Sequence, residues 1–499
     1  MYIRFLILFC FFFNVSTLFS QNSFRNKYFF PSIYSSESYA TTIEVEPDGY
    51  VLAGHLEYDN VDFDIVSCVM KVNLVGDIQW IKKVGSVPGQ TRLSTFSKLR
   101  NGGYLMAGQT DNFTSGSFII KMDGSGNFAW QKEITSYSSN FKSLETPQND
   151  LIISFNNRAG FSLLKLDSNA NHIWTKKFGV TDSCFVDDLI NTNDFGYIVI
   201  SHYHTRNGTN ILKLDSAGNI NWSKNINYAF SNIVQGPTGD LFLSRGMPIN
   251  NFNFILVRLS SNADTLWTKG FTGSNSETIT GLQATDDNGI ILTGYLGNGS
   301  YGTLGVKVDS TGSLNWSKVI GGSFDNAIGE DIKKISSNEY VVFSECFGDS
   351  LFLLSKIDST GFSGCAGSND PLSIQPFSLT IVSDSIDLFS LQVSLSDISF
   401  VNDTMDVNKM QICSSVGVDQ LTSSLIQIYP NPFCNQFSIS ETNPNGVVLV
   451  YDLAGNICKQ QLSTINETQI SAGSLIPGFY IICYKEEGRV LFSKALKVE

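Results

Sequence analysis

The segment KLDSAGNINWSKN, Lys213–Asn225, is one of seven copies of a phrase that recurs every 44 to 50 residues. Each copy has a basic residue at the position of Lys213, and these residues are Lys71, Lys121, Lys165, Lys213, Arg258, Lys307 and Lys356. Nine positions later the first six copies have a tryptophan: Trp80, Trp130, Trp174, Trp222, Trp267 and Trp316. These are all the tryptophans in the chain, and Cys365 takes their place in the seventh copy. The phrase is therefore a structural repeat.

Each copy predicts a hairpin turn followed by a strand. An Asp followed three positions later by Gly, as at Asp215 and Gly218, is typical of a tight type I turn. The residues before this turn are apolar on both faces, as in a strand buried on both sides. A second phrase, a turn and then an apolar strand, precedes each copy by about twenty residues, from DGYVLAG at Asp48 to NEYVVFS at Asn338. Together the two phrases predict four short strands per repeat.

Repeats of this length with four strands each are typical of a β-propeller, in which blades stack radially to bury their faces. The predicted fold class is all-β, a seven-bladed β-propeller followed by a small C-terminal β-sandwich. The tryptophans are predicted to be structural wedges against the neighbouring blade. Because the seventh copy lacks its tryptophan, we predict that Asn26–Phe30 pairs with the strand around Leu351–Ile357 and closes the ring. Tyr28, Phe29 or Phe30 is expected to fill the tryptophan site.

The N-terminus and the composition indicate an exported protein. Residues 1–20 contain one basic residue, Arg4, and an apolar run from Phe5 to Phe13, which is typical of a signal peptide and too short to span a bilayer. The formal charge is −13, with the acidic residues scattered, which argues against nucleic acid as a partner. No cofactor is predicted, although calcium stays open, and no transmembrane segment is predicted. Cys365 and Cys413 bracket residues 367–415 and suggest a clamp, although a sequence cannot establish the pairing.

The repeats, including GGSFDNAIGEDI from Gly321, resemble those of a family of secreted bacterial β-propeller proteins over roughly residues 38–365. The phrase also resembles the tryptophan-docking motif of quinoproteins, but its Asp-to-Gly spacing is one residue shorter. The adjacent cysteine pair of quinone-dependent dehydrogenases is missing. The sialidase Asp-box also differs in its spacing. The resemblance implies a fold and says almost nothing about an activity.

The C-terminal residues 416–499 predict about seven short strands and hence a β-sandwich. Their sequence motifs closely resemble those of the type A C-terminal sorting domain of type IX secretion substrates. The matching residues are Tyr429, Pro430, Asn431, Pro432, Tyr451, Asp452, Leu453, Gly455, Gly478, Tyr480, Lys494 and Lys497. The resemblance implies export by the type IX machinery, removal of the domain by its sorting peptidase, and release or attachment at the cell surface. The predicted organisation is a signal peptide at 1–20, a propeller at 21–366, an extended, weakly structured connector at 367–415 and the sorting domain at 416–499.

The strong catalytic motifs HExxH, GxSxG and GxxxxGK[ST] are absent. His202 and His204 lie two apart at a strand end, and three carboxylates cluster in DNVDFD from Asp59, but surface roles are the simpler interpretation of both. In an antiparallel four-stranded blade, the longer connections emerge at one end of the ring, where binding usually occurs. The candidate ligand-binding residues at that end are Tyr58, Asp59, Asp62, Phe113, His202, Tyr203, His204, Tyr295 and Tyr301.

The leading hypothesis is a non-enzymatic secreted or cell-surface protein that binds a glycan, a protein or an envelope component. A polysaccharide hydrolase or lyase built on the ring is the alternative, and a purely structural surface component is a third possibility. Carboxylates that converge in a central pocket would favour the enzyme, whereas an open, aromatic-lined face without paired acids would favour binding.

Overall fold

The computed structural model describes residues 23–414 and 428–498, apart from gaps at 31–36, 58–64, 86–89, 111–115, 135–138, 158–159, 180–183, 204–207, 247, 249–250, 298–300, 322–325, 347–350, 366, 385, 445, 453–456 and 487–488. The chain divides into two compact units, Met1–Gly417 and Val418–Glu499. Every regular element in the described residues is a β-strand. None of the described segments is a helix long and apolar enough to cross a membrane.

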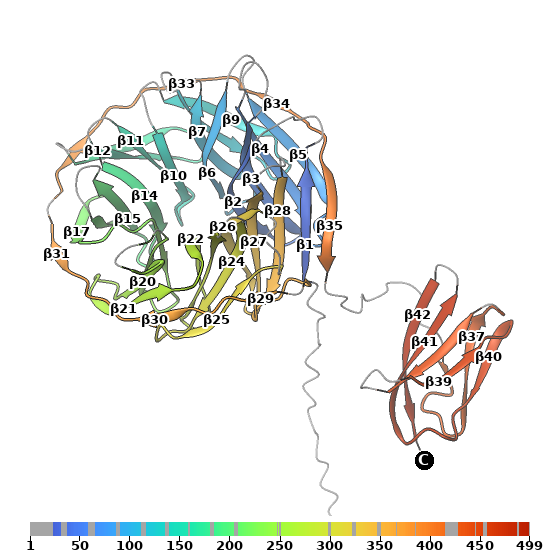
Figure 1. Cartoon of the computed structure of the whole chain (residues 1–499). Coiled ribbons are helices and arrows are strands. Elements are labelled where there is room, and N and C mark those ends of the chain that lie inside the picture. The colour runs from blue at the N-terminus through green and yellow to red at the C-terminus, as the bar shows by residue number, and fades with distance from the viewer. Residues whose placement is uncertain are drawn as a thin grey trace, which may run out of the picture. The chain divides into compact units, whose positions relative to one another are not determined.

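The first unit is a ring of seven antiparallel sheets, the blades, as the sequence predicted (Figure 1). Blade 1 has β2 (Glu37–Glu46), β3 (Gly49–Glu57), β4 (Ile65–Asn73) and β5 (Ile78–Gly85). Blade 2 has β6 (Thr91–Lys98), β7 (Tyr104–Thr110), β8 (Ser117–Met122) and β9 (Phe128–Ile134). Blade 3 has β10 (Ser139–Glu145), β11 (Leu151–Asn157), β12 (Gly160–Leu166) and β13 (His172–Phe178). Blade 4 has β14 (Cys184–Asn191), β15 (Tyr197–Tyr203), β16 (Thr209–Leu214) and β17 (Ile220–Ile226).

The remaining blades follow the same order, except that the seventh is completed from the N-terminus. Blade 5 has β18 (Asn232–Gln235), β19 (Leu241–Arg245), β20 (Phe254–Leu259) and β21 (Thr265–Thr272). Blade 6 has β22 (Ser276–Ala284), β23 (Ile290–Gly297), β24 (Tyr301–Val308) and β25 (Leu314–Val319). Blade 7 has β26 (Ala327–Ser336), β27 (Glu339–Cys346), β28 (Leu351–Asp358) and then β1 (Phe24–Phe29). The apolar core lies between adjacent blades, because the middle strands are buried on both faces.

The quoted phrase folds into the predicted turn. The Asp215 side chain accepts hydrogen bonds from the N–H groups of Ala217 (2.9 Å) and Asn219 (2.8 Å), and Gly218 has a φ of +77°. The basic residue of the phrase is bound to an acid of the second phrase, since Lys213 Nζ lies 2.7 Å from Asp194 Oδ1. Equivalent ion pairs are Lys71–Asp48, Lys165–Asp150, Arg258–Asp240, Lys307–Asp287 and Lys356–Glu339. The ion pair therefore joins the two repeated phrases at one end of the blade.

The tryptophans are wedges between blades, as predicted. Trp130, Trp267 and Trp316 donate their indole N–H to a carbonyl in the turn of the next blade, at distances of 3.1, 3.0 and 2.8 Å. A lysine follows two positions after each tryptophan, and Lys176, Lys224 and Lys318 bond the same turn of the next blade. Lys176 Nζ, for example, lies 2.7 Å from Ala217 O. Each Trp-x-Lys unit thus ties its blade to the following one.

β1 pairs with β28 and supplies the outer strand that blade 7 lacks. The residue in the tryptophan register is Phe24, which lies opposite Lys356 as Trp80 lies opposite Lys71. The expectation of Tyr28, Phe29 or Phe30 at this site was wrong, because Phe24 precedes Tyr50 by 26 residues (50 − 24), a wider spacing than in the other blades. Tyr28 still contacts blade 1, since its hydroxyl donates to Gly76 O at 2.8 Å.

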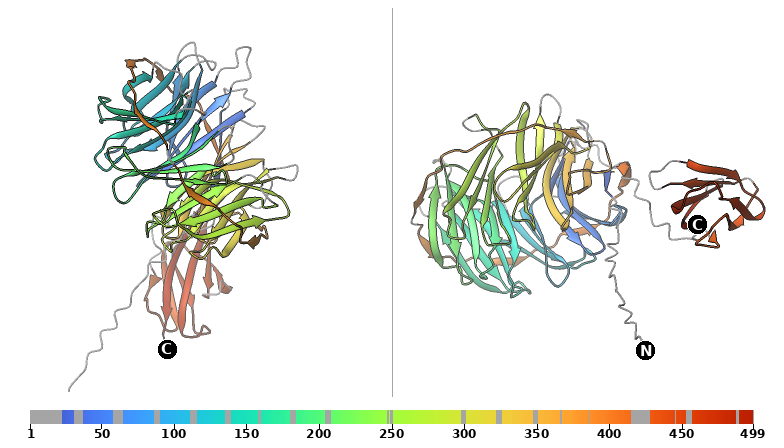
Figure 2. Two further views of the ribbon diagram at one scale, coloured as in Figure 1. Left: turned by 90° about the vertical axis from the view of Figure 1, so that its left-hand side faces the viewer. Right: turned by 90° about the horizontal axis from the view of Figure 1, so that it is seen from below.

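Residues 368–414 form a belt around the rim of the ring, and the expectation that this connector is weakly structured was wrong (Figures 1 and 2). The belt adds a fifth strand to each blade and visits the blades in reverse order. Its strands are β29 (Ser368–Asn369), β30 (Ser373–Gln375), β31 (Ile381–Ser383), β32 (Leu388–Ser390), β33 (Leu395–Asp397), β34 (Val401–Asp403) and β35 (Asn408–Ser414), which pair with blades 6, 5, 4, 3, 2, 1 and 7.

The belt has a seven-residue repeat of its own. Apolar side chains occur at every seventh position, at Leu372, Leu379, Ile386, Val393, Phe400 and Val407. These side chains pack against the apolar clusters between successive blades. One repeat therefore spans one blade, at ~3.3 Å per extended residue.

The two ends of the ring differ in their connections. One end carries the turns between the first and second strands and between the third and fourth strands of each blade, and we call it the turn end. We call the opposite end the loop end, because it has the connections between second and third strands and between blades. The connections between second and third strands range from 158–159 in blade 3 to 246–253 in blade 5.

The second unit is a small β-sandwich of seven strands. One sheet contains β36 (Ile428–Tyr429), β37 (Gln436–Thr442) and β40 (Asn466–Ser471), and the other contains β38 (Val447–Tyr451), β39 (Ile457–Leu462), β41 (Gly478–Glu486) and β42 (Arg489–Lys497). Its core includes Phe433, Phe437, Val450, Tyr480 and Ile482.

Candidate functional site

The first strands of the blades, β2, β6, β10, β14, β18, β22 and β26, surround the axis of the ring, and we call them the inner strands. Six of them have a β-bulge at an equivalent point, with the extra residues at Thr41, Ser94, Asn140–Phe141, Asp187, Thr280 and Glu330. A bulge redirects side chains and increases the local twist of a strand. The bulges therefore decide which side chains of the inner strands face the axis.

A cavity of about 420 Å³ lies on this axis, with lining residues from all seven inner strands. Its charged residues are Glu44, Lys142, Asp188, Glu330, Asp331 and Lys333. Its hydroxyl and amide groups come from Thr41, Thr42, Ser94, Thr95, Ser97, Ser143, Asn232, Thr280 and Gln283. Four carboxyl groups against two ammonium groups make the cavity polar and acidic.

Two of the carboxylates serve to join blades. Asp331 accepts hydrogen bonds from Thr42 Oγ1 at 2.6 Å and from the N–H of Ile43 at 3.2 Å, and Lys333 Nζ lies 3.3 Å away. Asp188 accepts a hydrogen bond from the N–H of Ile233 at 3.0 Å. Asp331 thus joins blade 7 to blade 1, and Asp188 joins blade 4 to blade 5.

Two other charged groups of the cavity remain open to a ligand. Within the described residues, the carboxyl group of Glu330 and the ammonium group of Lys142 have no hydrogen-bond or ion-pair partner, although burial raises the pKa of Asp187 and Asp188 and the charge of Lys142 opposes this rise. Burial, together with the nearby Glu345 and Asp331, raises the pKa of Glu330 well above its ordinary value. Burial also raises the pKa of Glu44, and Lys333 opposes this effect. A protonated Glu330 could both donate and accept a hydrogen bond.

Aromatic and histidine rings pair near the loop end of the inner and second strands. Tyr39 stacks on His55 in blade 1 with ring centroids 4.8 Å apart, and Phe185 stacks on His202 at 5.5 Å in blade 4. The two histidines occupy equivalent positions, each opposite its aromatic partner across the same pair of strands. Such rings beside polar groups offer a partly apolar surface at the loop end.

The two histidines have opposite pKa shifts. Burial, assisted by the nearby Arg92, lowers the pKa of His55 to about 4. The hydrogen bond between His202 Nδ1 and the Asp187 carboxylate, at 2.8 Å, raises the pKa of His202. His55 is therefore neutral at mildly acidic pH, where His202 is protonated.

The structure describes the side chains of only some of the predicted ligand-binding residues. His202 lies at the loop end of β15, half-exposed, and Tyr295 and Tyr301 form an edge-to-face pair at 5.4 Å on blade 6, where Tyr301 is 40% exposed. Tyr203 ends β15, but its side chain is outside the described residues. Tyr58, Asp59, Asp62, Phe113 and His204 also lie outside them. Phe252, in the connection between the second and third strands of blade 5, packs against Phe377 of the belt.

The cavity residues Glu44, Lys142, Asp188, Glu330, Asp331 and Lys333 were missed by the sequence analysis. A signal was present in the segment GGSFDNAIGEDI, in which two adjacent carboxylates, Glu330 and Asp331, interrupt the apolar residues of the strand. Among the described residues there is no group of three or more His, Cys, Asp or Glu side chains that could hold a metal ion.

The motif residues of the second unit hold its first turn to its last strand. The Asn431 side chain accepts a hydrogen bond from the N–H of Leu496 at 2.9 Å, next to Lys497 at the end of β42. Tyr480 is buried, and its hydroxyl donates to Ile476 O at 2.9 Å, beside Gly478. Tyr429, Pro430 and Pro432 are exposed, the side chain of Lys494 is not described, and Gly455 lies in a gap.

Residues 427–498 match a family model described as a secretion system C-terminal sorting domain. The second unit is a type IX secretion sorting domain. A sorting domain of this kind indicates delivery to the cell surface and interaction with the secretion machinery. No curated protein matches the chain.

Several solved structures are similar at low identity. PorZ, a surface component of the type IX secretion system of Porphyromonas gingivalis, has 10% identity over 93% of this chain and 70% of its own, with a TM-score of 0.35. A protein of unknown function from Bacteroides caccae has 11% identity over 50% of this chain and 89% of its own, with a TM-score of 0.34. A quinoprotein alcohol dehydrogenase-like protein from Bacteroides thetaiotaomicron has 9% identity over 67% and 85%, with a TM-score of 0.34.

Proposed function

We propose that the propeller is a non-enzymatic binding protein, which the sorting domain delivers to the cell surface, and that its ligand enters the axial cavity from the loop end. The observation that carries this proposal is the cavity of about 420 Å³, in which polar groups from seven strands converge. A concave site with a few converging polar groups is where small ligands and the ends of chains usually bind.

The chemistry of the cavity favours a glycan over an apolar ligand. Hydroxyl, amide and carboxyl groups pair with sugar hydroxyls, and the free carboxyl of Glu330 can both donate and accept in its protonated form. At the loop end, Tyr39, Phe185 and Tyr301 provide rings on which a sugar face can stack. The ordinary alternative is a water-filled channel, which needs the same polar lining.

A screen of residues 21–415 on a glycan array tests the proposal directly. We expect binding to a restricted set of glycans, and we expect Glu330→Gln to weaken it. The matched control is Lys334→Gln, because Lys334 lies on the same strand as Glu330 and bonds Asp286 instead of lining the cavity. If the Glu330→Gln protein bound every glycan on the array as tightly as the wild-type protein does, the cavity would not be the binding site.

A polysaccharide hydrolase or lyase is the second candidate, and the convergence of carboxyl groups in the axial cavity favours it, as the sequence analysis anticipated for an enzyme. Glu330 has a raised pKa next to other carboxylates in one cavity, a combination from which general acids are built. Release of reducing ends from the polysaccharides that bind, abolished by Glu330→Gln while binding persists, would establish this function. Binding without any product would favour the non-enzymatic one.

A further inference from the structure

The belt is fastened to the ring by many short contacts. β30, β31, β32, β33 and β34 each pair with their blade over three residues, and β29 pairs over two. Side chains add single bonds between the pairings, such as Lys132 Nζ to Asp397 Oδ1 at 2.6 Å and Asn275 Nδ2 to Asp370 Oδ1 at 3.1 Å. A load on one end of such a strap would break these contacts one after another, because each is loaded only when the one before it has opened.

The end of the belt also covers the closing strand of the ring. β35 pairs with β1 over six residues, from Phe24–Ser414 to Phe29–Asn408. β1 in turn pairs with β28, so β1 is held between a strand of the blade and the last strand of the belt. If β35 were peeled away, β1 would become an unprotected edge strand at the junction of blades 7 and 1.

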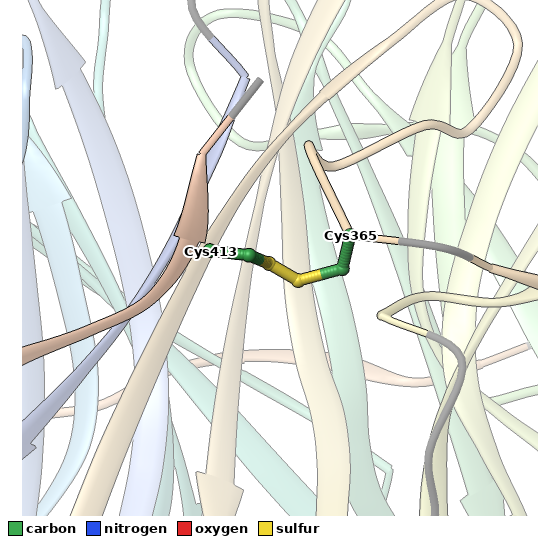
Figure 3. The surroundings of a disulfide bond; sticks show 2 residues. All are labelled: Cys365 and Cys413. Carbon is green, nitrogen blue, oxygen red and sulfur yellow. A yellow bond between two sulfur atoms is a disulfide. The ribbon is translucent and has the colours of Figure 1, made fainter. Parts of the chain in front are cut away.

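A disulfide joins the two ends of this belt. Cys365 precedes the belt and Cys413 lies next to its last residue in β35, and the two are bonded with a Cα–Cα distance of 5.5 Å (Figure 3). Since the belt passes all seven blades between these two cysteines, residues 365–413 form a covalent hoop around the ring. The bond thus connects the point where the chain leaves the ring and the belt begins with the point where the belt ends.

We propose that the Cys365–Cys413 bond is a mechanical clasp, which carries any load on the C-terminal tail past the belt and directly into blade 7. With the bond in place, a pull on residue 414 reaches Cys365 through the sulfur atoms, and residues 366–412 carry none of it. Without the bond, the same pull peels β35 from β1 and then removes the short belt strands in turn. The clasp lies immediately before the sorting domain, the part of the chain on which export acts.

Single-molecule force spectroscopy on the full chain tests the clasp. The molecule is held through a ligation tag inserted after Ala217, in an exposed turn of blade 4, and is pulled from the C-terminus. For the Cys365→Ser/Cys413→Ser variant we expect an early, low-force lengthening of about 16 nm, the extended length of residues 366–412 at ~3.5 Å per residue. The wild-type protein should show no such step before its blades unfold.

Two comparisons keep the test decisive. Cys434→Ser removes an exposed free cysteine of the sorting domain and should behave as the wild type does. If the double variant does not fold, the wild-type protein is pulled with and without a reductant, and the early step should appear only with it. Force traces that are the same with the bond intact and broken would overturn the proposal.

Discussion

Phe24 lies opposite Lys356 on blade 7, in the register that Trp80 holds opposite Lys71 on blade 1. An N-terminal residue therefore occupies the site of an aromatic wedge that the seventh repeat lacks. Phe24 is 4% exposed and belongs to the apolar cluster between blades 7 and 1, and Tyr28 and Asn26 reach the same turn of blade 1. The closure of the ring depends on this strand.

Replacing Phe24 should open this junction. We expect Phe24→Ala to lower the free energy of unfolding by roughly 3–5 kcal/mol, the usual cost of truncating a buried phenylalanine. Lys27 lies on the same strand but is only partly buried, so Lys27→Ala should change the free energy of unfolding by less than about 0.5 kcal/mol. Urea denaturation of the propeller followed by fluorescence measures both, and equal effects of the two substitutions would contradict the closure by Phe24.

The disulfide should also contribute to equilibrium stability. In the chain-entropy model, a bond that closes a loop of this length lowers the free energy of the folded state relative to the unfolded state by roughly 4 kcal/mol. We therefore expect Cys365→Ser to reduce the free energy of unfolding by about that amount, with Cys434→Ser as the neutral control. Calorimetry that finds the two variants equally stable would show that the belt holds by its other contacts alone.

The two equivalent histidines should give opposite dependences of stability on pH. The folded pKa of His55 is lowered from 6.5 to about 4, so its contribution is complete above about pH 6.5 and is lost as the pH falls towards 4. The folded pKa of His202 is raised, so its contribution is complete below about pH 6.5 and is lost as the pH rises through the folded pKa.

Substitution separates these two effects. The wild-type protein should lose free energy of unfolding between about pH 6.5 and 4 because His55 must be protonated. We expect His55→Gln to reduce this loss by up to roughly 3 kcal/mol. His202→Gln should remove stability chiefly in the acidic range. Denaturation at a series of pH values checks both, and parallel pH profiles for the two variants would contradict their opposite environments.

Removal of the sorting domain should stop export without unfolding the propeller. The last belt strand ends at Ser414 and the disulfide is at Cys413, so all the described strands of the ring precede residue 416. We expect the truncated protein to stay inside the outer membrane with its thermal unfolding unchanged. Fractionation of cells measures the first effect, and wild-type amounts of truncated protein at the cell surface would count against the sorting role.

The fold could be predicted from the sequence because the tryptophans mark the first six blades. Trp80 and its five equivalents sit at fixed positions after an Asp–Gly turn, and the turn geometry and the wedge contact require that spacing. The belt was missed because an apolar residue at every seventh position, as from Leu372 to Val407, does not match the period of an isolated strand. Its regularity comes from the distance between blades, which only the assembled ring defines.

The site was less predictable for a similar reason. Glu330 faces the axial cavity because β26 bulges at this residue, and a single sequence does not show where the register of a strand shifts. His202, Tyr295 and Tyr301 were chosen from their loop positions, and the structure adds only that each has an aromatic or acidic partner. The assignment of these residues to ligand binding stays a prediction.

The most direct test of the account compares binding after changes at the two ends of the ring. One variant carries Tyr301→Ala and His202→Gln at the loop end, and its control carries Ser125→Gln and Ala217→Gln in exposed turns at the turn end. The measurement is the affinity of each for the glycan or cell-surface component that the wild-type propeller retains. We predict that the loop-end variant loses at least about tenfold in affinity, or roughly 1.4 kcal/mol, while the turn-end variant is unchanged. Loss of binding in the turn-end variant alone would contradict the account.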